Sequence, residues 1–162
     1  MKKTVTPTFR FEKYTEVTPE FLKENGIKGI LTDLDSTLTE HDCQDVDDEL
    51  SSWIECMKDA GIPICIVSNN KTSRTAPFAR KIGVGYFCNA WKPHRPALRL
   101  ALRVIGCTTD NAVFMGDQLY TDIKGAVKMG MRSILVKPIG TKSTPYIRFK
   151  RMLERRQGIV ND

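Results

Sequence analysis

The chain has 162 residues, of which 41% are hydrophobic and 27% are charged, and its formal net charge is +6. This length and composition fit one domain with a single core, and they exclude a disordered or collagen-like chain. The longest stretch without Asp, Glu, Lys or Arg covers residues 60–70. It is about half as long as the roughly 20 residues that a membrane-spanning helix needs, which excludes a transmembrane protein.

The cysteines and the first residues indicate where the protein resides. The five cysteines are an odd number, and no two of them form a Cys-x-x-Cys pair, so neither a zinc site nor a disulfide framework is expected. The basic start of the chain is not followed by an apolar segment, and no secretory signal is expected. We therefore expect a reduced, cytoplasmic protein.

Short apolar runs alternate with helical patterns along the chain. Strands are expected at residues 28–32, 62–67, 84–88, 112–115 and 133–136. Helices are expected at residues 47–60, 72–82, 93–105 and 122–129, and a basic C-terminal helix at 145–157. This alternation predicts an α/β fold, namely a Rossmann-like three-layer α/β/α sandwich with a mostly parallel five-stranded sheet.

Residues 1–162 are expected to form a single domain, with residues 1–27 as an N-terminal extension. Four aromatic residues of this extension are expected to pack on the core, and interfacial membrane contact is the alternative. They are Phe9, Phe11, Tyr14 and Phe21.

Polar side chains follow the predicted strands at the points where the strands end. They are Asp33, Asp35, Ser68, Asn69, Lys92, Asp117 and Asp122. Ligands of parallel sheets bind beyond the carboxyl ends of the strands, so we expect these groups to meet at one edge. Converging carboxylates repel one another unless a cation lies between them, and hard oxygen ligands suit Mg²⁺.

Such a site can transfer phosphoryl groups. A carboxylate can attack phosphorus and form an aspartyl-phosphate. Asp35 lies two residues after Asp33 and faces the same side of an extended chain, so it can protonate the leaving alkoxide. Ser68 and Asn69 offer hydrogen bonds to phosphate oxygens, and Lys92 offers a positive charge.

These residues occur in a pattern that resembles the haloacid dehalogenase (HAD) superfamily of phosphatases. The pattern comprises Asp33-x-Asp35-x-Thr37, Ser68, Lys92 followed by Pro93, and Gly116-Asp117 with Asp122. The segments ENGIKGILTDLDSTL, IVSNN, GDQLYTDIKGA and KSTPYIRFKRMLERR resemble the YqeG-type subclass IIIA phosphatases, over residues 11–156. That group is similar to mitochondrial phosphatases that act on phosphatidylglycerophosphate.

The resemblance implies a role for each matching residue. Asp33 would be the nucleophile, Asp35 the general acid and base, and Lys92 the cation that neutralises the phosphate. The Mg²⁺ ligands would be Asp33, Asp35 (through its backbone carbonyl), Asp117 and Asp122. Thr37, which supports the nucleophile loop, would belong with Ser68 and Asn69 to the substrate-binding residues. Thr121 departs from the pattern, because many relatives have Asn before the second acid.

Chain spacing and charge indicate the substrate. Only 32 residues separate Asp35 from Ser68 and 23 separate Ser68 from Lys92, which leaves no room for a separate cap domain. An open site suits a bulky substrate or a site that a second subunit of a homo-oligomer closes. Residues 124–162 hold 10 Lys or Arg against two acidic residues, which favours an anionic partner.

We therefore expect a Mg²⁺-dependent phosphomonoester hydrolase that converts phosphatidylglycerophosphate to phosphatidylglycerol, in peripheral contact with a membrane through its basic C-terminal helix. One alternative is a HAD phosphatase for a soluble sugar phosphate or a nucleic-acid end. The other is a non-catalytic, basic nucleic-acid-binding module, although the sequence has no nucleic-acid-binding motif and no nucleic acid is expected. The roles of His41, His94 and Arg95 stay open.

Overall fold

The computed structural model describes residues 4–140 and Met152. Its strands are β1 (Phe9–Phe11), β2 (Gly29–Thr32), β3 (Ile64–Val67), β4 (Gly85–Phe87), β5 (Ala112–Gly116) and β6 (Arg132–Val136). Its helices are α1 (Pro19–Glu24), α2 (Asp48–Asp59), α3 (Thr72–Ile82), α4 (Pro96–Val104) and α5 (Lys124–Met129), with short helical turns η1 (Tyr14–Glu16) and η2 (Leu119–Ile123). The basic helix expected at 145–157 lies outside the described residues, apart from Met152.

Within the described residues, the strands form one sheet in the order β1-β6-β5-β2-β3-β4, and every neighbouring pair is parallel. This confirms the predicted parallel α/β fold. The sheet has six strands rather than five, because residues 9–11 pair in parallel with β6. Three residues are too few for a strand pattern to be recognised in the sequence.

The aromatic residues of the N-terminal segment pack on the core, as expected, rather than pointing outward for contact with a membrane. The rings of Phe9 and Phe11 each lie 5.0 Å from the ring of Phe21 in edge-on geometry. Tyr14 is fully buried, and its ring meets the Trp53 ring of α2 edge-on at 5.2 Å. Residues 9–21 thus contribute to the packing of the core.

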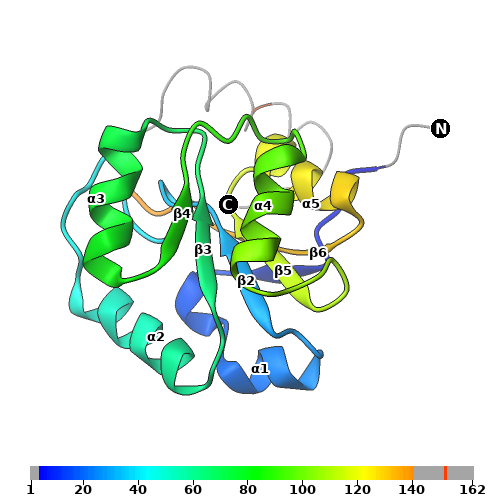
Figure 1. Ribbon diagram of the computed structural model, residues 1–162, viewed down its shortest axis with the longest axis horizontal. Coiled ribbons are helices and arrows are strands. Elements are labelled where there is room, and N and C mark those ends of the chain that lie inside the picture. Colours follow the sequence, from blue (N-terminus) through cyan, green and yellow to red (C-terminus); the bar gives the residue numbers. More distant parts are fainter. Residues whose placement is uncertain (1–3, 141–151, 153–162) are drawn as a thin grey trace.

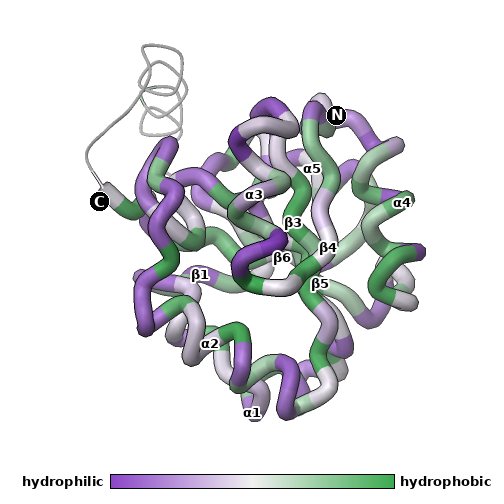
Figure 2. The backbone as a smooth tube through the Cα atoms, turned by 60° about the vertical axis from the view of Figure 1, so that its left-hand side comes forward, coloured by the Kyte–Doolittle hydropathy of each residue, from purple (hydrophilic) through white to green (hydrophobic). Residues whose placement is uncertain are grey.

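Helices cover both faces of the sheet (Figure 1). Alternate strand residues explain this, because successive side chains point to opposite faces. Ile30 and Ile66 belong to the core under α1, α2 and α3, whereas Leu31 and Val67 belong to the core under α4 and α5. The strands therefore consist of nearly continuous apolar residues, while hydrophilic residues concentrate in the surrounding segments (Figure 2).

The order of the strands decides which loops meet. Since β2 lies between β5 and β3, the chain segments that follow these three strands emerge side by side at the carboxyl edge. The intervals from β2 to β3 and from β3 to β4 are fully described. They hold α2 and α3, so neither interval contains an inserted domain. Among the described residues, no helix combines the length and the apolar character of a membrane span.

Candidate active site

Three buried carboxylates and one buried ammonium group meet at the carboxyl edge of the sheet. Oxygen atoms of Asp33, Asp117 and Asp122 all lie within 4.8 Å of one another. The Nζ atom of Lys92 lies 3.0 Å from Asp33 Oδ1 and 2.8 Å from Asp122 Oδ1. The structure therefore brings together four residues that the sequence predicted to meet.

The loop that carries Lys92 is held in place by Asn69. The Asn69 side chain accepts a hydrogen bond from the Lys92 backbone N–H at 2.7 Å and donates one to the Lys92 carbonyl at 3.3 Å. Asn69 was expected to bind substrate, and this stays a prediction; in the structure its amide is engaged by the Lys92 backbone. Its contacts are those of a residue that positions Lys92.

Burial and charge act on Asp33 in opposite directions. Burial raises the pKa of Asp33 from its ordinary value of 3.8 to about 7, with a further increase from Asp122, while the Lys92 ammonium limits the shift. Burial alone would lower the pKa of Lys92, but the Asp122 and Asp33 carboxylates outweigh burial and raise it. Lys92 is therefore charged at neutral pH, and its ammonium contacts two of the three acids.

This donor set fits a hard divalent cation. Asp33, Asp117 and Asp122 supply only carboxylate oxygens, the type of ligand that divalent cations such as Mg²⁺ take in proteins. Burial first, and repulsion from Asp122 second, raise the pKa of Asp33. A bound cation would offset both effects by stabilising the charged carboxylate. The residues present therefore fit a metal site.

The two carboxylates that follow β5 differ in their surroundings. Asp117 Oδ1 accepts a hydrogen bond of 3.0 Å from the buried Thr37 hydroxyl. Thr37 thus orients a carboxylate of the cluster, and its contact with substrate stays a prediction. Asp122 is fully buried, and its Oδ2 accepts a 3.1 Å hydrogen bond from the Gln118 backbone N–H. Both oxygens of Asp122 therefore have partners, and one of these partners is Lys92.

Comparison with known proteins places the chain in a family. The sequence model of the HAD-hydrolase-like family matches residues 90–148. The Bacillus subtilis (strain 168) protein named "Probable phosphatase YqeG" is 38% identical over 156 residues, which cover 96% of this chain and 91% of that protein. The chain belongs to the HAD superfamily of phosphatases. It resembles YqeG, and the alternative of a non-catalytic nucleic-acid-binding module is wrong.

A more distant relative and a solved structure are also similar to this chain. The chloroplastic/mitochondrial phosphatidylglycerophosphate phosphatase 1 of Arabidopsis thaliana is 28% identical over 137 residues, which cover 79% of this chain and 39% of that protein. A solved structure from Legionella pneumophila, described as a HAD superfamily subfamily III A hydrolase, matches with a TM-score of 0.54. It is 17% identical, and the match covers 81% of this chain and 74% of that one. At that identity it supports the HAD fold alone.

In this HAD phosphatase, the carboxylate of Asp35 lies in a second cluster beside the first. Its Oδ1 accepts hydrogen bonds from Arg74 Nε at 3.0 Å, from Arg74 Nη2 at 2.8 Å and from the Asp42 backbone N–H at 2.9 Å. Its Oδ2 accepts one hydrogen bond of 3.2 Å from Asn70 Nδ2. Since Oδ1 already has three donors, Oδ2 is the oxygen with room for a proton.

Sequence reasoning did not single out Arg74 or Asn70 as functional residues. Arg74 is buried on α3, and its guanidinium lies 5.5 Å from the Phe78 ring, one helical turn further on. An arginine at helical spacing from core residues was a usable signal, because such a charge is seldom buried without a partner. Asn70 also links Asp35 to Ser68, because its backbone N–H donates to Ser68 Oγ at 3.0 Å.

The remaining expected residues lie around this edge. Ser68 is buried directly after β3. His41 Nδ1 lies 3.9 Å from Asp35 Oδ1, and its Nε2 lies 3.3 Å from Asp42 Oδ2. His94 and Arg95 are exposed, next to the buried Lys92.

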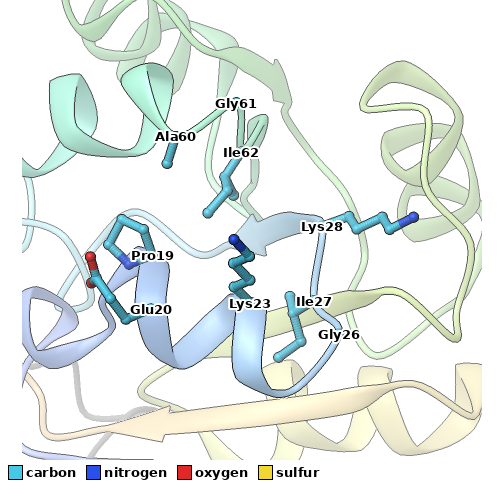
Figure 3. A pocket seen from close by; sticks show the side chains of 9 residues that line it. All are labelled: Pro19, Glu20, Lys23, Gly26, Ile27, Lys28, Ala60, Gly61 and Ile62. Carbon is cyan, nitrogen blue, oxygen red and sulfur yellow. The ribbon is translucent and has the colours of Figure 1, made fainter.

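A hollow of about 580 Å³ lies at the opposite edge of the sheet, before β2 and β3. Its lining includes Lys23 of α1 and the apolar side chains Ile27 and Ile62 (Figure 3). Glu20 is its one carboxylate. With one carboxylate and no second acid among these lining residues, this hollow lacks the converging carboxylates of the site at the other edge.

Gly116 must be glycine for the acidic cluster to form. A Cβ atom added there would overlap the Asp122 side chain. We expect Gly116→Ala to displace Asp122 and, with it, Lys92, lowering phosphatase activity about 100-fold or more, since small displacements of catalytic groups have effects of this size. The control is Gly85→Ala, whose added Cβ lies at an ordinary 3.5 Å from Cys65 Sγ. Equal activity of the two variants would contradict the geometry.

The pKa of Asp33 predicts how stability depends on pH in the metal-free protein. Because the pKa is raised from 3.8 to about 7 on folding, the native state holds the proton more tightly than the unfolded state. The contribution of Asp33 to the free energy of unfolding therefore falls as the pH rises through this window. Denaturant titrations in EDTA measure this slope. Asp33→Asn should reduce it, and an unchanged slope in the variant would contradict the assignment.

Proposed function

We propose that the protein hydrolyses phosphomonoesters through an aspartyl-phosphate on Asp33, with Mg²⁺ as its cofactor, and that its substrate is phosphatidylglycerophosphate. The observation that carries the proposal is the buried cluster of Asp33, Asp117, Asp122 and Lys92, in which one ammonium group touches two of three converging carboxylates. Such a cluster combines a nucleophile, a cation site and a fixed positive charge.

In the first half-reaction, an Asp33 carboxylate oxygen forms a bond to phosphorus while the bond from phosphorus to the ester oxygen breaks. The leaving alkoxide takes a proton from Asp35, and Oδ2 is the oxygen with room to carry that proton. Lys92 holds Asp33 in position through its contact with Oδ1 and offsets the negative charge of the transferring group.

In the second half-reaction, water attacks the phosphorus of the aspartyl-phosphate and regenerates the Asp33 carboxylate. Asp35, now ionised, accepts a proton from that water, as microscopic reversibility requires. Arg74 and the Asp42 backbone N–H hold Asp35 Oδ1 throughout, so the proton exchanges on Oδ2.

Mg²⁺ would be held by Asp33, Asp117 and the backbone of Asp35. Asp122 would lie beside these ligands without binding the ion. The ion would supply charge stabilisation to a phosphoryl oxygen. Asp122 is better suited to orient Lys92 than to bind the ion directly, because its two oxygens accept from Lys92 and from the Gln118 N–H.

Three observations support a lipid phosphate as the substrate. A relative that is 28% identical over 79% of this chain carries the name phosphatidylglycerophosphate phosphatase 1. The intervals around α2 and α3 hold no inserted domain that would cover the site, which suits a substrate with a large non-reacting part. The excess of Lys and Arg in residues 124–162 adds support for an anionic lipid partner.

Metal removal tests the cofactor. We expect EDTA to abolish phosphate release and Mg²⁺ to restore it, because the acidic cluster is short of positive charge without an ion. Mg²⁺ should also raise the melting temperature of the wild type more than that of Asp117→Asn, since ligand binding to the native state adds stability. Equal phosphate release in EDTA and Mg²⁺ would contradict the proposal.

A comparison of substrates tests the lipid assignment. Phosphate release is measured with phosphatidylglycerophosphate in vesicles, with soluble sugar phosphates and with 5′-phosphorylated oligonucleotides, at matched phosphate concentrations. We expect the highest kcat/KM for the lipid. A higher kcat/KM for a soluble phosphate or an oligonucleotide would leave the phosphatase chemistry in place and reject the lipid substrate.

A further inference from the structure

A row of arginines runs along one flank of α4. Arg95, Arg99 and Arg103 recur every four residues, which places them on the same side of a helix. Together with Lys128 of α5 they line a groove of about 420 Å³ between the two helices. We call these four residues the α4 basic stripe. Figure 1 shows α4 and α5 as neighbours on one side of the sheet.

The charges of the α4 basic stripe are not balanced by the described part of the chain. All four side chains are exposed, and none forms an ion pair or a side-chain hydrogen bond with another described residue. The other residues that line the groove are uncharged, namely Leu102, Cys107, Thr108, Thr109 and Met129. Four like charges around one groove create a positive potential that attracts anions.

Apolar side chains lie exposed on and beside the same helix. Leu100 and Val104 of α4 are 47% and 61% exposed, and Trp91, which precedes α4, is 75% exposed. A hydrogen bond of 2.8 Å from the His94 backbone N–H to the Trp91 carbonyl closes a turn between these residues. This turn immediately precedes α4, so Trp91 lies close to the start of the helix. Basic and apolar side chains together on one exposed helix are typical of segments that lie in the interface of a bilayer.

We infer that the exposed side of α4, with Trp91 at its beginning, docks on an anionic lipid bilayer. This inference rests on the proposed function and names the surface that would bring the site to its substrate. Lys92, which touches Asp33, is the residue after Trp91, so a bilayer that holds Trp91 lies next to the catalytic edge. A bilayer explains Leu100 and Val104 better than a nucleic acid does, since aliphatic side chains gain little from a phosphate backbone.

Vesicle sedimentation with the full chain tests the α4 basic stripe. Partitioning onto vesicles of phosphatidylglycerol and phosphatidylcholine is compared for the wild type and Arg99→Gln/Arg103→Gln. The expected loss is about 25-fold, from about fivefold for each basic residue at an anionic surface. The control is Arg10→Gln/Lys23→Gln, which removes two exposed charges from β1 and α1 and should bind like the wild type. If the two double variants partition equally onto the vesicles, the inference is overturned.

Tryptophan fluorescence tests the position of Trp91. Trp53 is buried in the core, so a change on binding reports Trp91. We expect anionic vesicles to shift the emission of the wild type to shorter wavelength and to protect it from iodide quenching. Trp91→Phe should still bind without this shift. Binding of the wild type with no change in emission or quenching would contradict the proposed orientation.

Two further measurements separate this inference from the proposed function. Turnover of soluble p-nitrophenyl phosphate should be the same for the wild type and Arg99→Gln/Arg103→Gln, while turnover of the lipid substrate in vesicles falls in the variant. Loss of both activities would indicate damage to the catalytic site and overturn the docking role. Binding of single-stranded DNA is measured for the same two proteins. If the wild type binds this DNA more tightly than anionic vesicles, and the variant binds it more weakly, the α4 basic stripe is a nucleic-acid site and the inference is overturned.

Discussion

Asp33→Asn is expected to reduce phosphate release by at least about four orders of magnitude, the size of loss seen when a covalent nucleophile is removed. The amide cannot form the aspartyl-phosphate, but it has nearly the same shape and can still accept a hydrogen bond from Lys92. Since burial raises the pKa of Asp33, loss of its charge should not lower the free energy of unfolding at neutral pH in EDTA. Steady-state phosphate release and urea denaturation measure the two quantities.

Asp33→Ala serves as a second variant, because an asparagine at this position could deamidate back to aspartate. Asp110→Asn is the matched control, since Asp110 is exposed and precedes β5 at the opposite edge of the sheet. Its activity should equal that of the wild type. An Asp33→Ala protein that folds and retains more than about a hundredth of the activity would show that another group attacks phosphorus.

Lys92→Met is expected to have the largest effect on stability. The substitution removes the ammonium that touches Asp33 and Asp122 and leaves these two buried carboxylates without their cation. Breaking a buried ion pair from one side typically lowers the free energy of unfolding by about 3–5 kcal/mol. We expect a loss of this size in EDTA at neutral pH, with activity abolished, measured by urea denaturation and phosphate release.

Two conditions distinguish loss of charge from loss of packing. Mg²⁺ should restore part of the stability of Lys92→Met, because a divalent ion can replace the missing charge, and acidic pH should restore part of it by protonating the carboxylates. Lys71→Met is the control, since Lys71 is exposed and its ammonium has no ion-pair or hydrogen-bond partner among residues 4–140. A stability loss in Lys92→Met that neither Mg²⁺ nor acidic pH reduces would contradict the electrostatic explanation.

The helices and strands could be predicted because apolar runs, and the glycines at which helices end, are local features of the sequence. The expected strands at 112–115 and 133–136 lie within β5 and β6, and the expected helix at 72–82 matches α3. The order of the strands is not a local property. That β2 lies between β5 and β3 follows from how the faces pack, and only this order brings Asp33 next to Asp117.

The candidate site was predictable in its residues but less so in its contacts. Asp33, Lys92, Asp117 and Asp122 form the cluster that the strand ends suggested. Asn69 and Thr37 have partners that the sequence did not indicate, namely the Lys92 backbone and Asp117. Short polar side chains beside a loop bind either ligand or backbone, and the sequence does not distinguish these two partners.

Arg74 illustrates the same difficulty at longer range. It lies 39 residues after Asp35 in the chain and donates two hydrogen bonds to it. In the sequence it is one of several basic residues of an amphipathic helix, and its partner is fixed only when α3 packs against the sheet.

Trapping the covalent intermediate tests the central claim most directly. The protein is mixed with substrate and Mg²⁺, quenched in acid within one turnover, digested and analysed by mass spectrometry. The account predicts one phosphoryl group on the peptide that contains Asp33, removable by hydroxylamine and absent from Asp33→Asn. A phosphoryl group on another residue, or full turnover with no covalent phosphoryl group at any quench time, would contradict it.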